Sequence, residues 1–473
     1  MGLLELLRIL VTTPSTWEHG SAEIAQRILE VAHSLGLHVT SFPEAHRDRM
    51  EFNVMVTPFA LDHAIWKNTP VLLLLNHLDT RLGLHRALWK ENQGNPFQIV
   101  IHDGAYWGLG VAEQKADLAC KLLALRDWHQ MVSHHTTVSC QKVPIWVGTF
   151  GHYQGFRGLQ RWLRHNRFRI DQVWVGHPTE LQIIPMSNGY ARVEIRVMYE
   201  EDELQALGEG FFHESHSSSR LFQLTPGSSL KFDENSELFT ALINYFRELP
   251  TNTALLDLEG GRQFNVPPHQ IYAEVDLVTG KLRFPVIQKL INLFDGFSGL
   301  HEKFKKNRNA RYVPEHLTFN VGVMRRQESY LLLDSIVRIP PHVTPEELKS
   351  WEKEARKLVS QNGCQFFISD YKPPYDYSDL FSEFYQKAQS QLRSLYPQDF
   401  QPSAAALGLS HEGCFLARQN IPIAAFGPGE SVSNLHSPGE RVSIREVDIA
   451  YQFYRSWIVE ETHVLSSTTQ SLG

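Results

Sequence analysis

His77 and Asp79 are the first side chains whose types and spacing could support metal or acid–base chemistry. They follow an unbroken apolar run, Val71–Leu75, and are separated from each other by one residue. Such a run is typical of a strand buried in a parallel sheet. Because strand side chains alternate, the carboxylate of Asp79 would share a face with His77 and could orient its ring, as metal-ligating histidines usually require. Taken alone, the same residues also fit a core strand that ends in a polar turn.

Four more residues of these types occupy similar places in the chain. One is in the first turn of a helix after a glycine-rich loop, two directly follow apolar strands, and one follows a Gly-Pro-Gly phrase: Glu113, His152, His177 and His436. In an open α/β sheet the carboxyl ends of the strands gather at one edge, where ligands bind. Imidazole and carboxylate ligands suit Zn²⁺, Co²⁺ or Mn²⁺, and such an ion can activate water. The phrases together therefore predict a metal site at that edge.

The elements that must position these side chains alternate between helix and strand up to residue 186. Helices are expected at 21–35 and 113–125, and strands at 38–41, 52–56, 71–75, 98–102, 143–149 and 172–176. The same pattern returns from residue 370, with a helix at 378–395 that Ser378 would cap, a strand at 421–426 and a helix at 444–459. This alternation predicts an α/β three-layer sandwich with a mostly parallel sheet.

Residues 187–369 have a different character. Residues 190–198 alternate between apolar and charged side chains, as in a strand with one exposed face. Further strands are expected at 270–276, 317–324 and 329–338, and helices at 236–248 and 345–360. This pattern predicts an inserted α+β domain, an antiparallel sheet with helices on one face. The first domain is thus expected to comprise residues 1–186 and 370–473, and the second residues 187–369.

Composition excludes several classes of function. The net charge of −7 is spread along 473 residues, which argues against a nucleic-acid-binding face. The basic run 303–311 is interpreted as a solvated loop or a helix end. No apolar run approaches the roughly 18 residues of a membrane-spanning helix. The four cysteines are scattered, without metal or disulfide spacing, so reduced thiols and a cytoplasmic location are expected.

With these phrases in view, the chain resembles the aminoacylase, acetylornithine deacetylase, succinyl-diaminopimelate desuccinylase and carboxypeptidase group of co-catalytic zinc hydrolases. The resemblance covers nearly the whole chain and implies that the insert is a lid of the dimerisation type. It implies that His77 is the first metal ligand and Asp79 the aspartate that orients it. Glu113 falls at the metal-bridging acid, and His436 at a ligand of the second metal.

The same resemblance implies two substrate-binding residues in the insert. Arg338 falls where the family has an arginine suited to a substrate carboxylate. His216 resembles a lid histidine that helps to hold the scissile carbonyl. A carboxylate-bearing small molecule or peptide is therefore the expected substrate. Lids of this type pair subunits, whereas a long insert can mimic a partner within one chain, so a monomer or a homodimer is expected.

The chain also departs from the family pattern. The bridging acid is Glu113 rather than aspartate, and the acid expected before Pro-Thr is His177. The family's paired glutamates, its general base and a second-metal ligand, are replaced by His152 and Tyr153. Loss of a general base typically removes about 10²–10⁴-fold of rate. His152 could act as a substitute base or as a further ligand, and the loss of carboxylates favours one ion over two.

Three hypotheses follow from the sequence. The first is a metal-dependent hydrolase of amide or peptide bonds, a metallopeptidase or deacylase with an altered ligand set. The second is a catalytically inactive pseudoenzyme of the same family that binds a ligand or a partner protein. The third is a purely structural α/β protein. If metal binding is retained, the expected ligands are His77, Glu113, His177 and His436, holding one or two ions.

Overall fold

The structure is a computed structural model, and the chain forms two compact units. It describes residues 1–46, 49–81, 86–134, 139–209, 218–223, 237–262, 264–265, 268, 270–277, 285–396, 410–430, 434 and 438–463. The first unit comprises Met1–Ser187, Asp376–Leu407 and His411–Gly473, and the second comprises Asn188–Tyr375 and Gly408–Ser410. None of the described helices has the length and apolar composition needed to cross a bilayer.

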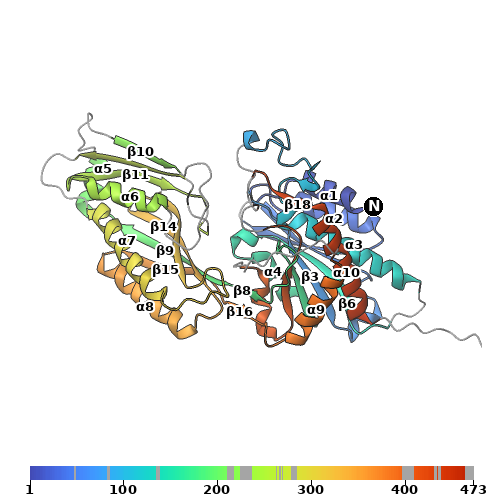
Figure 1. Cartoon of the computed structure of the whole chain (residues 1–473). Helices are drawn as coiled ribbons and strands as arrows, with labels where there is room; N and C mark the ends of the chain where they lie inside the picture. Colours follow the sequence, from blue (N-terminus) through green and yellow to red (C-terminus); the bar gives the residue numbers. More distant parts are fainter. Residues whose placement is uncertain are drawn as a thin grey trace, which may run out of the picture. The chain divides into compact units, whose positions relative to one another are not determined.

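A six-stranded sheet organises the first unit, in the order β1-β2-β6-β3-β7-β17 (Figure 1). Its strands are β1 (His38–His46), β2 (Arg49–Thr57), β3 (Val71–His77), β6 (Val143–Thr149), β7 (Ile170–Gly176) and β17 (Ile423–Phe426). The last four pair in parallel, whereas β1 and β2 form an antiparallel hairpin that joins β6 antiparallel. The prediction of a mostly parallel sheet is confirmed.

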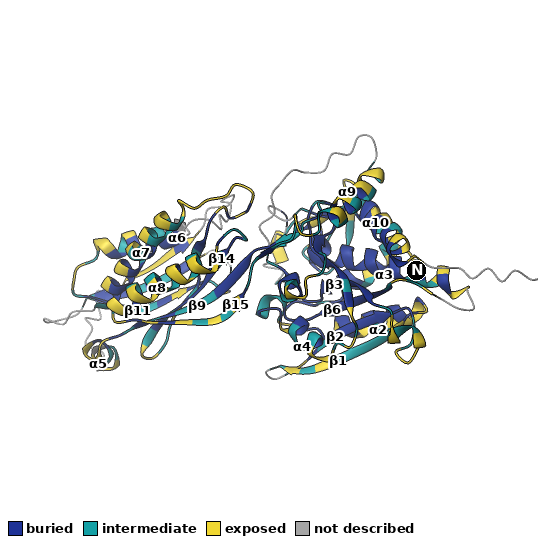
Figure 2. Cartoon of the chain, turned by 90° about the horizontal axis from the view of Figure 1, so that it is seen from below, coloured by how far each residue is buried: buried dark blue, intermediate teal, exposed yellow. Residues whose placement is uncertain are grey.

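Both faces of this sheet are covered, because every residue of β3 and β6 is buried (Figure 2). Leu72 and Leu74 of β3 belong to a core cluster with residues of five helices. These helices are α1 (Leu3–Thr12), α2 (Ala22–Ser34), α3 (Ala116–Ser133), α9 (Ser382–Ser394) and α10 (Ile444–Thr462). Leu159 and Trp162 are buried outside that cluster, on α4 (Arg157–His165), which packs against β2 and β6. The sheet therefore lies between two helical layers, as predicted.

Short elements complete the first unit. The remaining strands are β4 (Val100–His102), β5 (Ala105–Trp107) and β18 (Arg441–Ser443), which form one small sheet, and β8 (Met186–Ser187), which pairs with β16 (Tyr375–Asp376). The short helices are η1 (Ala64–Lys67), η2 (Arg86–Leu88), η3 (Val111–Lys115), η4 (His152–Gln154), η5 (Glu412–Phe415) and η6 (Ala417–Gln419).

Two helix starts differ from the sequence predictions. Helix α9 begins at Ser382 rather than at Ser378. Ser378 donates from its backbone N–H and its hydroxyl to the carboxylate of Asp376, so it belongs to a turn before the helix. Helix α3 begins at Ala116, because the residues from Val111 to Lys115 form a π-helical turn. π-Turns often occur at functional sites.

The second unit is built on a seven-stranded antiparallel sheet in the order β10-β12-β11-β13-β14-β9-β15. Its strands are β9 (Gly189–Met198), β10 (Ser218–Gln223), β11 (Thr253–Gly260), β12 (Gln270–Leu277), β13 (Thr318–Arg326), β14 (Tyr330–Ile339) and β15 (Gln365–Lys372). Its helices are α5 (Glu201–Glu209), α6 (Glu237–Glu248), α7 (Pro285–Phe304) and α8 (Pro345–Gln361). The α+β character of this unit was predicted, but α5, α7, β10, β11 and β15 were not.

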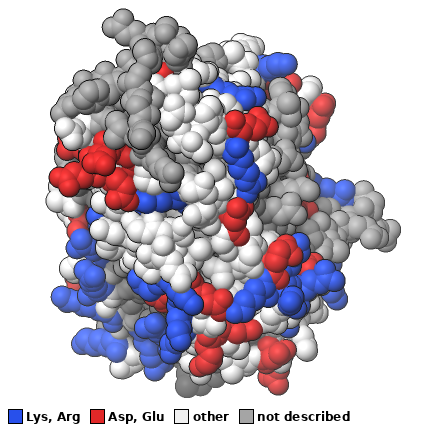
Figure 3. Space-filling view, turned by 90° about the vertical axis from the view of Figure 1, so that its left-hand side faces the viewer, with Lys and Arg blue, Asp and Glu red and all other residues white. Residues whose placement is uncertain are grey.

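Charges of both signs are mixed on the surface seen in Figure 3. Two of the ion pairs in the second unit join Arg247 to Asp295 and Lys303 to Glu354. The basic run that begins at Lys303 lies at the end of α7 and continues through exposed residues, so its interpretation as a helix end is confirmed.

Candidate active site

His77 is the last residue of β3, and its ring is buried. Its Nδ1 lies 2.7 Å from the backbone oxygen of Asp79, while the carboxylate of Asp79 is farther away, at 3.8 Å. Since a carbonyl oxygen only accepts, Nδ1 carries the proton and the lone pair is on Nε2. The Asp79 carboxylate was expected to orient this ring, but the backbone oxygen of Asp79 accepts the hydrogen bond from His77 instead. The Nε2 atom has no hydrogen-bond partner among the described residues.

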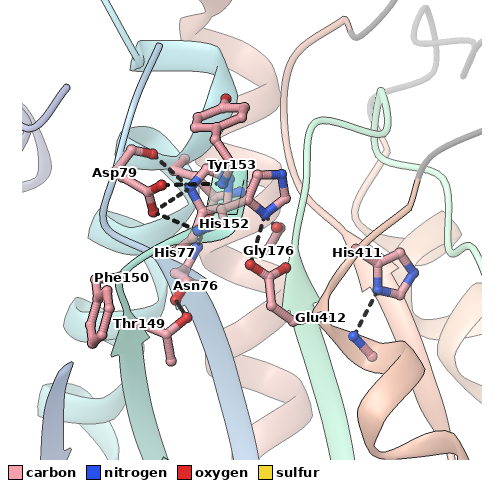
Figure 4. Close-up of polar contacts among 12 residues, drawn as sticks. Asn76, His77, Asp79, Thr149, Phe150, His152, Tyr153, Gly176, His411 and Glu412 are labelled. Atoms are coloured by element: carbon pink, nitrogen blue, oxygen red, sulfur yellow. Dashed lines mark hydrogen bonds and ion pairs between the residues drawn. The ribbon is translucent and has the colours of Figure 1, made fainter. Parts of the chain in front are cut away.

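The Asp79 carboxylate holds the neighbouring strand end instead. It accepts the backbone N–H groups of His152, at 3.2 Å, and Tyr153, at 3.4 Å. Burial raises the pKa of Asp79 to about 7, although the positive charge of His152 acts to lower it. Asp79 therefore fixes the turn that carries His152 (Figure 4).

His152 stacks on His77, with ring centroids 3.9 Å apart, and forms an ion pair with Glu412. Its Nδ1 is 2.7 Å from Oε1 of Glu412, a buried residue in η5 (Figure 4). Burial lowers the pKa of His152, but the charge and hydrogen bond of Glu412 outweigh burial, so the pKa is raised. Burial likewise raises the pKa of Glu412, and His152 outweighs it, which holds the carboxyl well below its usual range. The two residues therefore form a charge-coupled pair.

His177 follows β7 and lies beside the same group, with its ring centroid 6.3 Å from that of His152. Its Nδ1 is buried and has no hydrogen-bond partner among the described residues. Burial lowers its pKa to about 3, and the nearby His411 contributes to the same shift. His177 is therefore neutral at pH 7, the form in which imidazole binds a metal.

His411 closes the far side of His177, with ring centroids 6.2 Å apart. Its Nε2 donates to the backbone oxygen of Met186 and its Nδ1 accepts from the backbone N–H of Gly413. Both ring nitrogens are thus used, and burial lowers its pKa to about 4. His411 is a structural neighbour with no lone pair left for an ion.

Glu113 lies in the π-turn η3, whose start is held by another acid. The buried Glu440 accepts the backbone N–H groups of Gly110, Ala112 and Glu113 at 2.9–3.0 Å. Gly110 has φ +76°, a left-handed conformation that glycine adopts at little cost, and it allows the chain to enter the turn. Burial raises the pKa of Glu113 well above its usual value, and Glu440 adds to this shift.

A satisfied polar network lies directly beneath these strand ends. Asn76 donates to Gln114 and Asp117 and accepts from Trp146. Lys121 pairs with Asp117 at 2.8 Å and donates to the backbone oxygens of Leu75 and Trp174, so it joins β3 to β7.

Gly176, the last residue of β7, has no room for a side chain. A Cβ at this position would lie 2.1 Å from Nδ2 of Asn76 and 2.3 Å from Oδ2 of Asp117. The polar network can therefore reach the strand end that carries His177 only because this residue is glycine.

Four of the expected site residues lie together: His77, Asp79, His152 and His177. Arg338 is on β14 in the second unit, where its guanidinium donates to the backbone oxygen of Asn265. His216 and His436 lie outside the described residues.

The sequence reading did not find Glu412 or His411. They follow no apolar strand, and Glu412 is 260 residues from its partner His152, so no local pattern marks them. In the sequence the two residues form a short polar phrase, Ser410-His411-Glu412, between apolar residues, which has no strand or helix periodicity.

The described residues offer two suitable ligands for a zinc-type ion but not a complete set. His77 Nε2 and His177 Nδ1 are buried nitrogens without hydrogen bonds to other described residues, which suits metal ligation. The described part of the chain contains no group of three His, Cys, Asp or Glu side chains arranged around one point. Tyr153, at the position of an expected glutamate ligand, is a poor ligand at neutral pH because a phenol has a pKa of about 10.

Comparison with known proteins identifies the family. Residues 73–460 match the model of peptidase family M20/M25/M40. The chain belongs to this family. The expected resemblance to zinc hydrolases of the aminoacylase and carboxypeptidase group is therefore confirmed at the level of the family.

Several proteins resemble the chain in sequence or in fold. Acetylornithine deacetylase from Shigella sonnei (strain Ss046) is 26% identical over 201 residues, 41% of this chain and 47% of that protein. The chain thus matches about half the length of this relative. The structure of human carnosine dipeptidase 1 aligns with a TM-score of 0.56 at 11% identity, covering 97% of this chain and 96% of that one. The M20 family metallo-carboxypeptidase Sso-CP2 from Sulfolobus solfataricus aligns at 0.55 and 15% identity, covering 97% and 98%.

Proposed function

We propose that the chain is a hydrolase of amide or peptide bonds in which His152 and Glu412 form the proton-accepting pair. The observation that carries this proposal is the 2.7 Å contact between Nδ1 of His152 and Oε1 of Glu412. The family resemblance implies a glutamate base at the position of His152. A carboxylate that accepts from Nδ1 fixes the tautomer of a histidine and stabilises its protonated form. His152 thereby regains the function that a glutamate would supply.

The proton transfers follow from this tautomer. In neutral His152 the proton is on Nδ1, directed at Glu412, so the Nε2 lone pair can take a proton from water. The water oxygen then bonds to the carbonyl carbon of the substrate while Glu412 balances the charge of the imidazolium. When the C–N bond breaks, Nε2 returns the proton to the leaving nitrogen. Protons and charge balance over the cycle, and no other acid is required.

Two histidines would hold the metal ion that relatives of this family use. His77 presents Nε2, since its Nδ1 donates to Asp79, and His177 presents Nδ1. Glu113 and His436 are proposed as the remaining ligands. When bound, a zinc-type ion would polarise the scissile carbonyl as a Lewis acid. Asp79 is proposed to act indirectly, by holding the backbone that carries His152.

A second candidate, a pseudoenzyme that binds a ligand or partner without turnover, has one observation in its favour. Within the described ranges, no three His, Cys, Asp or Glu side chains are arranged to hold an ion. On the basis of the family resemblance, we further propose that the substrate carries a carboxylate and is bound through Arg338 and His216.

The test is turnover of N-acetyl amino acids and dipeptides by the full chain, with added zinc and with chelator. The wild type should turn over at least one substrate class only with zinc, and Glu412→Gln should lower kcat by about 10²–10⁴-fold with little change in KM. Glu383→Gln, an exposed glutamate at the start of α9, is the matched control. A chain without zinc-dependent turnover, or an unchanged kcat in Glu412→Gln, would overturn the proposal.

The pair can also be tested without a substrate. In metal-free protein, NMR titration should give His152 a pKa above about 6.5, the usual value for histidine, and Glu412→Gln should lower it. A His152 pKa that does not respond to Glu412→Gln would refute the coupling itself.

A further inference from the structure

Phe156 has a backbone conformation that bulky residues rarely adopt. It lies directly before α4 at φ +60° and ψ +36°, in the left-handed region, and the residue is buried. In this region the Cβ atom crowds the backbone, so the conformation is costly for most residues other than glycine. Strained backbone of this kind persists where the surrounding structure enforces it, and it is concentrated at functional sites.

Hydrogen bonds close the loop that contains Phe156 and enforce this conformation. The backbone N–H of Gly158 donates to the backbone oxygen of Phe150 at 2.9 Å, which joins the two ends of the loop. The buried side chain of Asn53 spans the same ends, since it accepts from the N–H of Phe150 at 3.1 Å and donates to the oxygen of Gly158 at 2.9 Å. The fold of this loop therefore sets the direction of the Phe156 side chain.

The Phe156 ring packs against the imidazole of His152. The two ring centroids are 5.0 Å apart, and the ring planes are inclined at 51°. Asp79 holds the backbone of His152, but a backbone anchor does not fix the ring, because the last torsion of a histidine side chain has broad energy minima. Packing of neighbouring rings is needed to keep Nδ1, rather than the Cδ2 edge, directed at Glu412. His77, stacked at 3.9 Å, is one such ring and Phe156 is another.

The same phenyl ring also contacts the short helix that carries Glu412. Phe415, the last residue of η5, has its ring centroid 6.1 Å from that of Phe156, with the ring planes at 89°. This edge-to-face arrangement is one of the favoured geometries of aromatic pairs. Glu412 is the first residue of η5. Phe156 thus contacts both His152 and the helix of its acidic partner.

We propose that Phe156 is a positioning residue, which holds the His152 imidazole and η5 in the arrangement where Nδ1 of His152 meets Glu412. The inference rests on the proposed function of this pair. Phe156 acts through His152 rather than on the reacting atoms. Its ring contacts also account for the unusual backbone, since a glycine would relieve the strain but would leave His152 without the ring beside it.

The hydrogen bond between His152 and Glu412 can be observed without a substrate. In the metal-free full chain with ¹⁵N-labelled histidine, the Nδ1–H proton of His152 should give an NMR signal protected from exchange, which Glu412→Gln assigns by shifting or removing it. Phe156→Ala and Phe156→Gly should each lose this signal, because both lack the ring. Phe156→Gly should nevertheless unfold at a higher urea concentration than Phe156→Ala, since glycine adopts the left-handed conformation without strain.

Kinetics separate positioning from a general loss of structure. Phe156→Ala should lower kcat by about 10–100-fold with little change in KM, since a misplaced base costs rate rather than binding. In the Glu412→Gln background the same change should lower kcat by less than about 3-fold, because the pair is already broken. Phe384→Ala removes a partly buried ring from α9 in the same unit and should leave both the signal and kcat unchanged.

The outcomes distinguish this inference from the proposed function. A His152 signal that persists in either Phe156 variant, or an equal loss of kcat with and without Glu412→Gln, overturns the inference. If Phe156→Ala does not fold by circular dichroism, Phe156→Gly replaces it in both tests. A wild type without turnover refutes the proposed function, whereas loss of the His152 signal in the Phe156 variants then still supports the positioning role.

Discussion

Buried polar groups lie at two levels near the carboxyl ends of β3 and β7, and the two levels differ in how many of their polar atoms have hydrogen-bond partners. At the deeper level, Asn76, Asp117 and Lys121 have hydrogen-bond or ion-pair partners, and Lys121 binds the backbone of both strands. At the outer edge, His77 Nε2 and His177 Nδ1 are equally buried but lack partners within the described part of the chain.

This difference separates structural polar groups from functional ones. Buried polar atoms are almost always hydrogen-bonded, because an unpaired one costs about 1–3 kcal/mol. A satisfied network offsets the cost of its burial within the protein, whereas two imidazole nitrogens without partners in the described part of the chain keep their lone pairs available for the proposed ion. Asn76 of the deeper set directly precedes His77 of the outer set, so for these two residues only the hydrogen-bond partners distinguish the roles.

The largest predicted effect is on the deeper network. Lys121→Met should lower the free energy of unfolding by about 3–5 kcal/mol, since it leaves the Asp117 carboxylate buried without its cation. Urea unfolding monitored by circular dichroism measures this loss. Lys121→Met/Asp117→Asn should recover part of it, because the uncompensated charge is then removed.

Lys67→Met, at an exposed lysine of η1, is the control for the lysine change and should alter stability by less than about 0.5 kcal/mol. A loss below about 1 kcal/mol for Lys121→Met would show that the deeper network contributes little to the stability of the fold.

Much of the sheet could be predicted from the sequence because its strands are continuous apolar runs. β6 was predicted with both ends correct, and β3 was predicted up to the residue before Asn76. Helix α7 was missed although Val286, Leu290, Leu293 and Phe297 follow helical spacing. Strand β15 alternates in burial, but Phe367 and Tyr371 lie on its exposed side and Lys372 on its buried side, so its sequence shows no apolar–polar alternation.

The site was only partly predictable, for a physical reason. His77, His152 and His177 each follow an apolar strand, so local pattern and sheet topology bring them to one edge. The partners that define their chemistry come from distant parts of the chain, as Glu412 does for His152 and Glu440 does for the turn of Glu113. Such contacts depend on the tertiary fold and leave no periodic signal in the sequence.

A smaller loss of stability is expected at a partly exposed cluster of ion pairs near the end of α10. Glu461, near the end of α10, pairs with Lys142 at 2.7 Å and Lys387 at 2.6 Å, and the two lysines are partly exposed. Burial raises the pKa of Glu461, but both lysines outweigh it, so its pKa is lowered. Glu461→Gln should cost about 1 kcal/mol at pH 7, well below the loss at Lys121, because solvent screens the pairs.

The sign of the pH dependence follows from the lowered pKa. The contribution of Glu461 is complete above the unfolded-state pKa of about 4.3 and is lost as the pH falls through the lower folded-state value. Urea midpoints of wild type and Glu461→Gln should therefore differ at pH 7 and converge in strong acid. A difference that persists undiminished at low pH would contradict the ion-pair origin.

The most direct test of the outer edge is thermal unfolding of the chelator-treated full chain titrated with zinc, compared between wild type and His177→Asn. If His77 Nε2 and His177 Nδ1 bind an ion, the wild-type Tm should rise with added zinc until ~1 ion is bound. At a zinc concentration a hundredfold above Kd, the stabilisation should be about 2.7 kcal/mol. His177→Asn should keep the metal-free Tm and lose most of the rise. A wild-type Tm unmoved by zinc, with less than about a tenth of an ion bound, would contradict the account.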